Sequence, residues 1–140
     1  MSNIILLTGA NGFLGTQIAL NILKNHDDNI IALVRGKNKE DAVNRLRRSW
    51  WEFPELLQEM DKKIQVLNGD ITKNDLGLEK SEYDDLVQTV THVIHTAADW
   101  RLKATLEELE KTNVQGTQNV LKLAHLAHEN HGLGRFSHIS

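Results

Sequence analysis

Three glycines at three-residue intervals follow a short apolar run near the start of the chain. Gly9, Gly12 and Gly15 form a G-x-x-G-x-x-G pattern after residues 4–7, and apolar residues take helical spacing from Phe13 onward. A helix N-terminus carries unpaired N–H groups and partial positive charge, so a pyrophosphate can bind where no Cβ blocks its approach. The order strand, glycine turn, helix therefore predicts a dinucleotide-binding loop. The residues expected to contact the dinucleotide are Thr8, Gly9, Asn11, Gly12, Phe13, Leu14 and Gly15.

A second apolar run, residues 30–34, ends at Arg35, 20 residues beyond Gly15. In dinucleotide-binding folds the second strand ends beside the adenosine ribose at about this spacing. An acidic residue there would bind the ribose 2′-hydroxyl, whereas a cation favours a 2′-phosphate. Arg35 therefore predicts NADPH rather than NADH as the cofactor. Arg45, on the helix expected next, could turn back to the same phosphate.

Two further strands, at residues 64–68 and 92–95, are also followed by residues that suit a nucleotide. Asp70 could accept a hydrogen bond from the adenine amino group, or it could cap the turn that follows, as Asp often does. The two roles are compatible. Ala97 and Ala98 follow the fourth strand, where small side chains let a cofactor lie close to the backbone.

Strands and helices alternate along all 140 residues, without a repeat or a linker-like segment. Such alternation predicts an α/β, Rossmann-like fold with three layers, in which helices cover both faces of a parallel sheet of order 3-2-1-4-5. The length suggests one domain, residues 1–140, that stops after the fifth strand. Further helices are expected at residues 39–60, interrupted at Pro54, at residues 81–90 with Ser81 as N-cap, and at residues 112–129, with the fifth strand at 135–140.

Composition excludes several classes of function. A formal net charge of −3, from 16 basic and 19 acidic residues, gives no electrostatic argument for nucleic-acid binding. Cysteine is absent, and no apolar run approaches the ~20 residues of a membrane span, so a cytoplasmic protein is the default expectation. His125, His128 and His131 recur every three residues, but no carboxylate or cysteine completes a convincing metal site, and none is expected.

Other aromatic and histidine side chains are expected to pack rather than to bind ligands. Trp50, Trp51 and Phe53 are interpreted as packing residues, since aromatic side chains usually serve cores. His92 and His95 lie three positions apart on a strand, so they face opposite sides of the sheet and cannot easily share a metal. We interpret them as core or edge histidines.

These motifs together resemble the extended short-chain dehydrogenase/reductase superfamily, whose T-G-x-x-G-x-x-G turn matches residues 8–15. Within that superfamily, L-V-R at 33–35, G-D-I-T at 69–72, D-L-G-L at 75–78 and T-N-V-Q-G-T at 112–117 are similar to the thioester reductase branch. That branch includes fatty acyl-CoA reductases, carboxylic acid reductases and the terminal reductase domains of nonribosomal peptide and polyketide synthetases.

The resemblance implies NADPH-dependent reduction of an acyl thioester, held on CoA or on a carrier protein, to an aldehyde or alcohol. It implies that the pyrophosphate lies at the three glycines, and that Asn113 supports the active-site geometry from its helix. The other implied cofactor contacts are Arg35 and Arg45 to the 2′-phosphate, Asp70 and Ile71 to adenine, and Ala97 and Ala98 beside the nicotinamide ribose.

The family's catalytic acid has no counterpart in this chain. The family uses a Tyr-x-x-x-Lys pair, but the one tyrosine here is Tyr83, with Val87 four residues on, and Ser140 falls just short of the family's catalytic Ser or Thr. We therefore expect no catalytic residue and interpret the chain as the N-terminal, nucleotide-binding part of a larger reductase, inactive alone. It is expected to self-associate through the face where the rest of the enzyme would dock. A non-catalytic NADP(H)-sensing module and a fragment of a sugar epimerase or dehydratase are the alternatives.

Overall fold

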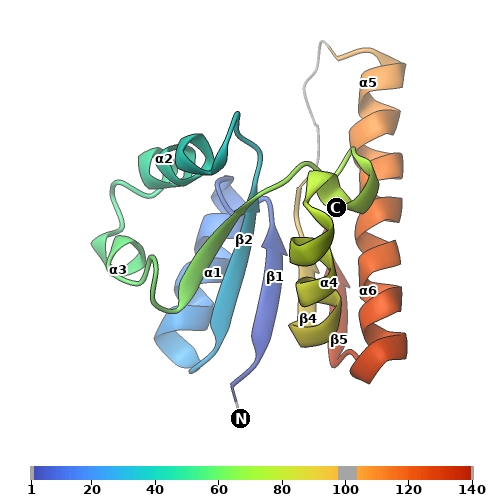
Figure 1. The fold of residues 1–140 in the computed structure, drawn as a ribbon. Coiled ribbons are helices and arrows are strands. Elements are labelled where there is room, and N and C mark those ends of the chain that lie inside the picture. Colours follow the sequence, from blue (N-terminus) through green and yellow to red (C-terminus); the bar gives the residue numbers. More distant parts are fainter. Residues whose placement is uncertain (1, 98–103, 140) are drawn as a thin grey trace.

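The computed structural model describes residues 2–97 and 104–139 and contains one sheet of five strands in the order β3-β2-β1-β4-β5 (Figure 1). All four strand pairs are parallel. The α/β class and the predicted strand order are both confirmed. The strands are β1 (Ile4–Thr8), β2 (Asn29–Val34), β3 (Ile64–Asn68), β4 (His92–His95) and β5 (Arg135–His138).

Helices cover both faces of the sheet, which gives the three predicted layers (Figure 1). One face packs against α1 (Phe13–Asn25), α2 (Lys39–Ser49) and α3 (Pro54–Leu57), and the other against α4 (Lys80–Thr89) and α6 (Thr117–His131). A short helix, α5 (Leu106–Glu110), continues through a π-helical turn, η2 (Lys111–Gly116), directly into α6. A 3₁₀ turn, η1 (Asn74–Gly77), precedes α4.

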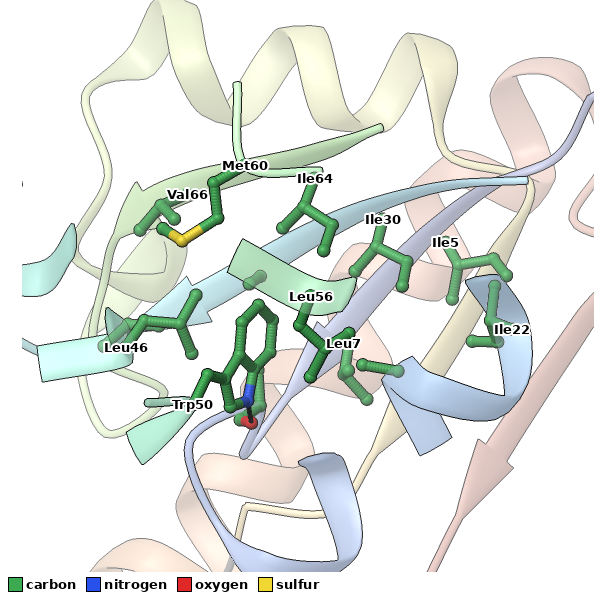
Figure 2. Close-up of a cluster of buried hydrophobic side chains, with 14 of the residues drawn as sticks. Ile5, Leu7, Ile22, Ile30, Leu46, Trp50, Leu56, Met60, Ile64 and Val66 are labelled. Carbon is green, nitrogen blue, oxygen red and sulfur yellow. Dashed lines mark hydrogen bonds between the residues drawn. The ribbon is translucent and has the colours of Figure 1, made fainter. Parts of the chain in front are cut away.

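The strands are buried on both faces because their side chains alternate between two cores. On β1, Ile5 and Leu7 point into the core beneath α1, α2 and α3, and Leu6 points into the core beneath α4 and α6. Burying one such aliphatic side chain contributes about 1.5–3 kcal/mol. Figure 2 shows the first core, in which the indole of Trp50 lies among Leu7, Leu46 and Leu56.

Several expected boundaries and placements were wrong in detail. Helix α4 is capped by Glu79 rather than Ser81, because Glu79 and Glu82 each accept from the other's backbone N–H. Trp51 is 71% exposed, whereas its neighbour Trp50 is fully buried, so only Trp50 confirms the expected packing of the pair. The last long helix begins at Leu106 instead of Thr112.

Two observations concern the classes of protein considered above. Within residues 2–97 and 104–139, no helix has both the length and the apolar character needed to cross a membrane. The same residues contain no group of three or more His, Cys, Asp or Glu side chains arranged to hold a metal ion. Of the three helical histidines, His125 pairs with Glu129 and His128 accepts the backbone N–H of Leu133.

Candidate functional site

A cleft of about 990 Å³ lies where the strands of the sheet end at their carboxyl termini. It brings together the predicted residues from the segments that follow β1, β2, β3 and β4 and from α2. Two predicted residues are exceptions: Ala98, which lies outside the described residues, and Asn113. The predicted residues that line it are Thr8, Gly9, Asn11, Gly12, Phe13, Leu14, Gly15, Arg35, Arg45, Asp70, Ile71 and Ala97. Ligands of open parallel sheets bind at this edge, so the position suits a nucleotide.

The three glycines of the loop serve different purposes. Gly9 has φ +70°, and a Cβ on it would lie 2.8 Å from the backbone nitrogen of Ala97. A Cβ on Gly15 would overlap the carbonyl oxygen of Gly9 and lie 2.7 Å from its carbonyl carbon, so this glycine lets α1 pack on the loop. A Cβ on Gly12 would meet only the Gly9 oxygen, at 3.4 Å, and would otherwise stand in open space. Gly12 therefore keeps the cleft itself clear, as a bound phosphate requires.

The N-terminus of α1 opens into this cleared space. Its cap residue, Gly12, offers no side-chain acceptor, and its first turn contains no acidic side chain. The first N–H groups and the positive end of the helix dipole are therefore available to an anion. Phe13 and Leu14 are 83% and 42% exposed and line the cleft, where they were expected to contact the dinucleotide, although they do not join the buried face of the helix.

Trp50, the residue that follows α2 as its C-cap, fixes the glycine loop from the side of the core. The indole Nε1–H of Trp50 donates to the carbonyl oxygen of Ala10 (3.2 Å) and to Oγ1 of Thr16 (3.1 Å). The Thr16 hydroxyl in turn donates to the carbonyl oxygen of Gly12 (2.6 Å). The sequence predicted that Trp50 packs but gave no sign that it bonds to the loop.

Two guanidinium groups line the side of the cleft that follows β2. Arg35 is exposed at the end of the strand, and Arg45 is held by a 3.0 Å contact between its Nε and Oδ2 of Asp41. The same oxygen accepts the backbone N–H of Lys37 (2.9 Å). That bond is the main reason why the pKa of Asp41 lies below its usual value; desolvation opposes the shift and Arg45 adds to it. An ionised Asp41 therefore orders both the loop and Arg45.

Asp70 lies on the wall of the cleft that follows β3. Its Oδ1 accepts the backbone N–H of Thr72 (2.9 Å) and the Thr72 hydroxyl (2.7 Å), which confirms the turn-capping role. Burial raises the pKa of Asp70, but the two Thr72 bonds and the charges of Arg35 and Lys73 outweigh it, so the pKa lies below its ordinary value. Asp70 is therefore a carboxylate at neutral pH. Its contact with adenine stays a prediction.

The buried side chain of His95 connects the cleft residue Thr8 to Thr117 of α6. Thr8 Oγ1 accepts the N–H groups of Thr96 and Ala97 (3.1 Å each), so its proton is directed to Nδ1 of His95 (2.7 Å). The His95 ring is then protonated on Nε2, which donates to Oγ1 of Thr117 (3.0 Å). Burial, with a smaller contribution from stacked His138, lowers the pKa of His95 to about 4. This neutral ring holds the Thr96–Ala97 segment in place and confirms His95 as a core residue.

Asn113 lies beside the cleft, exposed in the π turn η2, and its supporting role stays a prediction. Its neighbours Lys111 and Thr112 do line the cleft, as do Lys73 and Glu108. Sequence reasoning named none of these four as site residues, nor four more that line the cleft: Leu33, Gly69, Thr72 and Thr96. Lys73 carries a recognisable signal, since it directly follows the G-D-I-T motif, whereas Lys111 has none.

An NAD-binding domain family, described as male sterility protein, has a model that matches residues 7–140. The chain belongs to this family. Among curated relatives, the large subunit of L-2-aminoadipate reductase from Penicillium chrysogenum is 37% identical over 121 residues, which are 85% of this chain and 9% of that protein. This chain therefore spans less than a tenth of that relative's length.

Two solved structures show the same fold. The terminal R domain of the myxalamid polyketide–nonribosomal peptide pathway superposes with a TM-score of 0.83 at 28% identity, over 99% of this chain and 35% of that one. The reductase domain of a nonribosomal peptide synthetase from Mycobacterium tuberculosis gives 0.81 at 32% identity, over 100% and 33%. The chain is thus a Rossmann-like NAD(P)-binding module of the extended short-chain dehydrogenase/reductase type, similar to about one third of a reductase domain.

Proposed function

We propose that residues 1–140 form one domain, the NADPH-binding part of a thioester reductase. The observation that carries the proposal is the shared cleft, in which an uncapped helix N-terminus faces two arginines that follow β2. A glycine-lined N-terminus suits a pyrophosphate, and guanidinium groups at the adenosine end suit a 2′-phosphate. The reductase relatives support the same class of reaction.

The types of residue that line the cleft support one orientation of such a cofactor. The N–H groups that follow Gly12 bind the pyrophosphate, Arg35 and Arg45 bind the 2′-phosphate, and Asp70 with Ile71 contacts the adenine. Thr8, Gly9, Asn11, Phe13, Leu14 and Gly15 complete the loop, and Ala97 borders the nicotinamide ribose. The same contact by Ala98, which lies outside the described residues, stays a prediction. When bound, NADPH supplies the hydride that reduces a thioester carbonyl to an aldehyde or alcohol.

The acyl substrate and its carrier are proposed from the relatives alone. One relative is named as a reductase of L-2-aminoadipate, and one solved structure as the terminal R domain of a polyketide–nonribosomal peptide pathway. With the family resemblance, these names support an acyl thioester, on CoA or on a carrier protein, as the partner of the complete enzyme. The described residues also expose Leu106, Val114 and Leu121 along α5, η2 and α6. These apolar side chains support the expectation that this face docks or self-associates, which stays a prediction.

A cofactor titration with the parent chain and Arg35→Ala tests the proposal. We expect the parent to bind NADPH more tightly than NADH and Arg35→Ala to lose most of that preference. A charge-assisted hydrogen bond contributes about 1.5–3 kcal/mol, which corresponds to roughly ten- to a hundredfold in affinity. Arg48→Ala, an exposed arginine of α2 outside the cleft, is the matched control and should keep the preference. Equal affinities of the parent for NADPH and NADH would refute the assignment of Arg35.

A further inference from the structure

The wall of the cleft that should face adenine is a short turn, residues 70–73, with few hydrogen bonds among its own residues. Asp70, Ile71, Thr72 and Lys73 all line the cleft. Within the turn, Thr72 bonds to the Asp70 carboxylate and the N–H of Lys73 donates to the Asp70 carbonyl (3.1 Å). The carbonyl oxygen of Lys73 accepts the backbone N–H of Leu76 (3.1 Å), whereas that of Ile71 finds its partner outside this segment.

Both carbonyls are bound by one side chain of the distant helix α6. Nδ2 of Asn119 donates to the carbonyl oxygen of Ile71 (2.7 Å) and to that of Lys73 (3.2 Å). A primary amide carries two N–H groups on one nitrogen, so both bonds can form at once. Aspartate at this position has no donor, and leucine of similar shape has none. The amide therefore supplies a bond pattern that its near-isosteres lack.

A glycine one turn earlier brings the same turn against the helix. A Cβ on Gly116 would lie 2.7 Å from Cδ1 and 2.9 Å from Cγ1 of Ile71. A glycine inside a helix is destabilising relative to alanine, and here it occupies the junction of η2 and α6. Ile71, only 8% exposed, packs into the space that this glycine leaves.

The other side of the turn is tied to a left-handed segment. The N–H of Asp70 donates to the carbonyl oxygen of Leu76 (2.8 Å), and Asp75 and Leu76 have φ values of 53° and 58°. Such values are unfavourable for residues other than glycine, yet Leu76 keeps its side chain fully buried. The turn is thus held from both sides by elements that lie outside its own sequence.

We propose that Asn119 is a positioning residue of the cleft: it aligns Asp70 and Ile71 with the adenine ring through the carbonyls of Ile71 and Lys73. This inference rests on the proposed function. Among residues 2–97 and 104–139, Oδ2 of Asp70 accepts no hydrogen bond, so it is available to the adenine amino group. Because the aligned turn reads that amino group, the effect of Asn119 falls on base recognition and not on cofactor binding as a whole.

The test compares NADPH with its analogue in which hypoxanthine replaces adenine, so that the amino group is lost. We expect the parent chain to bind NADPH at least tenfold more tightly than the analogue. Asn119→Leu should lower this preference at least threefold and leave the affinity for nicotinamide mononucleotide within twofold of the parent. Asn130→Leu, an exposed asparagine of the same helix, is the matched control and should keep the parent's preference.

Gly116→Ala provides a second test of the inference, which remains available if Asn119→Leu fails to fold. Alanine favours the helix, but its Cβ displaces Ile71, so helicity should hold while the preference for adenine falls. Unchanged preference in both variants, or an equal loss for all three nucleotides, would overturn the inference. If the parent binds NADPH without preferring adenine, the inference alone fails; if the parent does not bind NADPH, the proposed function fails with it.

Discussion

The indole N–H of Trp50 donates to the carbonyl oxygen of Ala10, so a residue 40 positions away fixes the backbone of the glycine loop. Trp50 is the C-cap residue of α2 and is fully buried in the core on that side of the sheet, and the same N–H also donates to the hydroxyl of Thr16. The loop that should bind the pyrophosphate is therefore shaped by the helix that carries Arg45. Both ends of the nucleotide site depend on how α2 docks.

Replacing Trp50 by phenylalanine should destabilise the chain by about 1–3 kcal/mol, because the buried carbonyl of Ala10 loses the indole donor and keeps only the 3.3 Å contact with the Thr16 hydroxyl. Urea unfolding followed by circular dichroism measures the loss. Trp51→Phe, at a residue 71% exposed, should change the free energy of unfolding by less than about 0.5 kcal/mol. Equal losses in the two variants would contradict the structural role assigned to Trp50.

Lowering the pH should destabilise the fold through His95. The pKa of this ring falls from an ordinary value near 6.5 to about 4 on folding, so the unfolded chain binds the proton more readily between these values. The contribution of neutral His95 to the free energy of unfolding is therefore complete above about pH 6.5. It falls by about 3 kcal/mol as the pH drops to about 4. The carboxyls of Asp41 and Asp70 have lowered pKa values and lose their contribution at lower pH.

Urea unfolding between pH 4.5 and 7.5 measures this slope in the parent chain and in His95→Gln. The variant should be less stable at pH 7.5 and show a shallower dependence on pH, because glutamine does not titrate. His131→Gln, at an exposed histidine of α6, should keep the slope of the parent. A slope in His95→Gln as steep as that of the parent would show that other groups cause it.

The hydroxyl of Tyr83 is buried and has no hydrogen-bond partner among the described residues. Burial raises the pKa of this phenol, with the charges of Asp75 and Asp84 adding to the effect. Because an unpaired buried hydroxyl is costly, Tyr83→Phe should raise the free energy of unfolding by about 1 kcal/mol. Thermal unfolding of the two proteins checks this, and a lower midpoint for the variant would reveal a partner for the hydroxyl.

No turnover is expected from this chain alone, because its one tyrosine, Tyr83, lies in the core and is not followed by Lys at the fourth position. The measurement is aldehyde release from an acyl thioester with NADPH, at enzyme concentrations high enough to detect a single turnover. Release above the rate without protein would mean that another group donates the proton.

The sequence predicted the parts of the site that depend on local pattern. The strand order, the glycine loop and Arg35 follow from apolar runs, glycine spacing and the distance to the second strand. The bond from Trp50 to Ala10 and the clamp of Asn119 on the turn at Ile71 could not be predicted, because they join residues 40 and 48 positions apart. Contacts of this kind leave no periodic signal in a single sequence.

Helix ends were the weakest predictions, for a related reason. The π turn η2 ends at Gly116, where Ile71 packs from another segment. No pattern in the local sequence predicts this π turn. Glu79 caps α4 although Ser81 has the better intrinsic preference, since the reciprocal bond with Glu82 favours the earlier start.

The tight contact between Gly15 and Gly9 limits where the site can change. No side chain fits at Gly15, not even a methyl group, so any substitution there would have to displace the backbone of the loop. Arg35 and Lys37, by contrast, are solvent-facing and carry no part of either core, so they can change at little expense to folding. If Arg35 sets the preference between NADPH and NADH, as proposed, that preference can be changed by substitutions after β2 without disturbing either core, whereas the packing of the glycine loop allows no such freedom at Gly15.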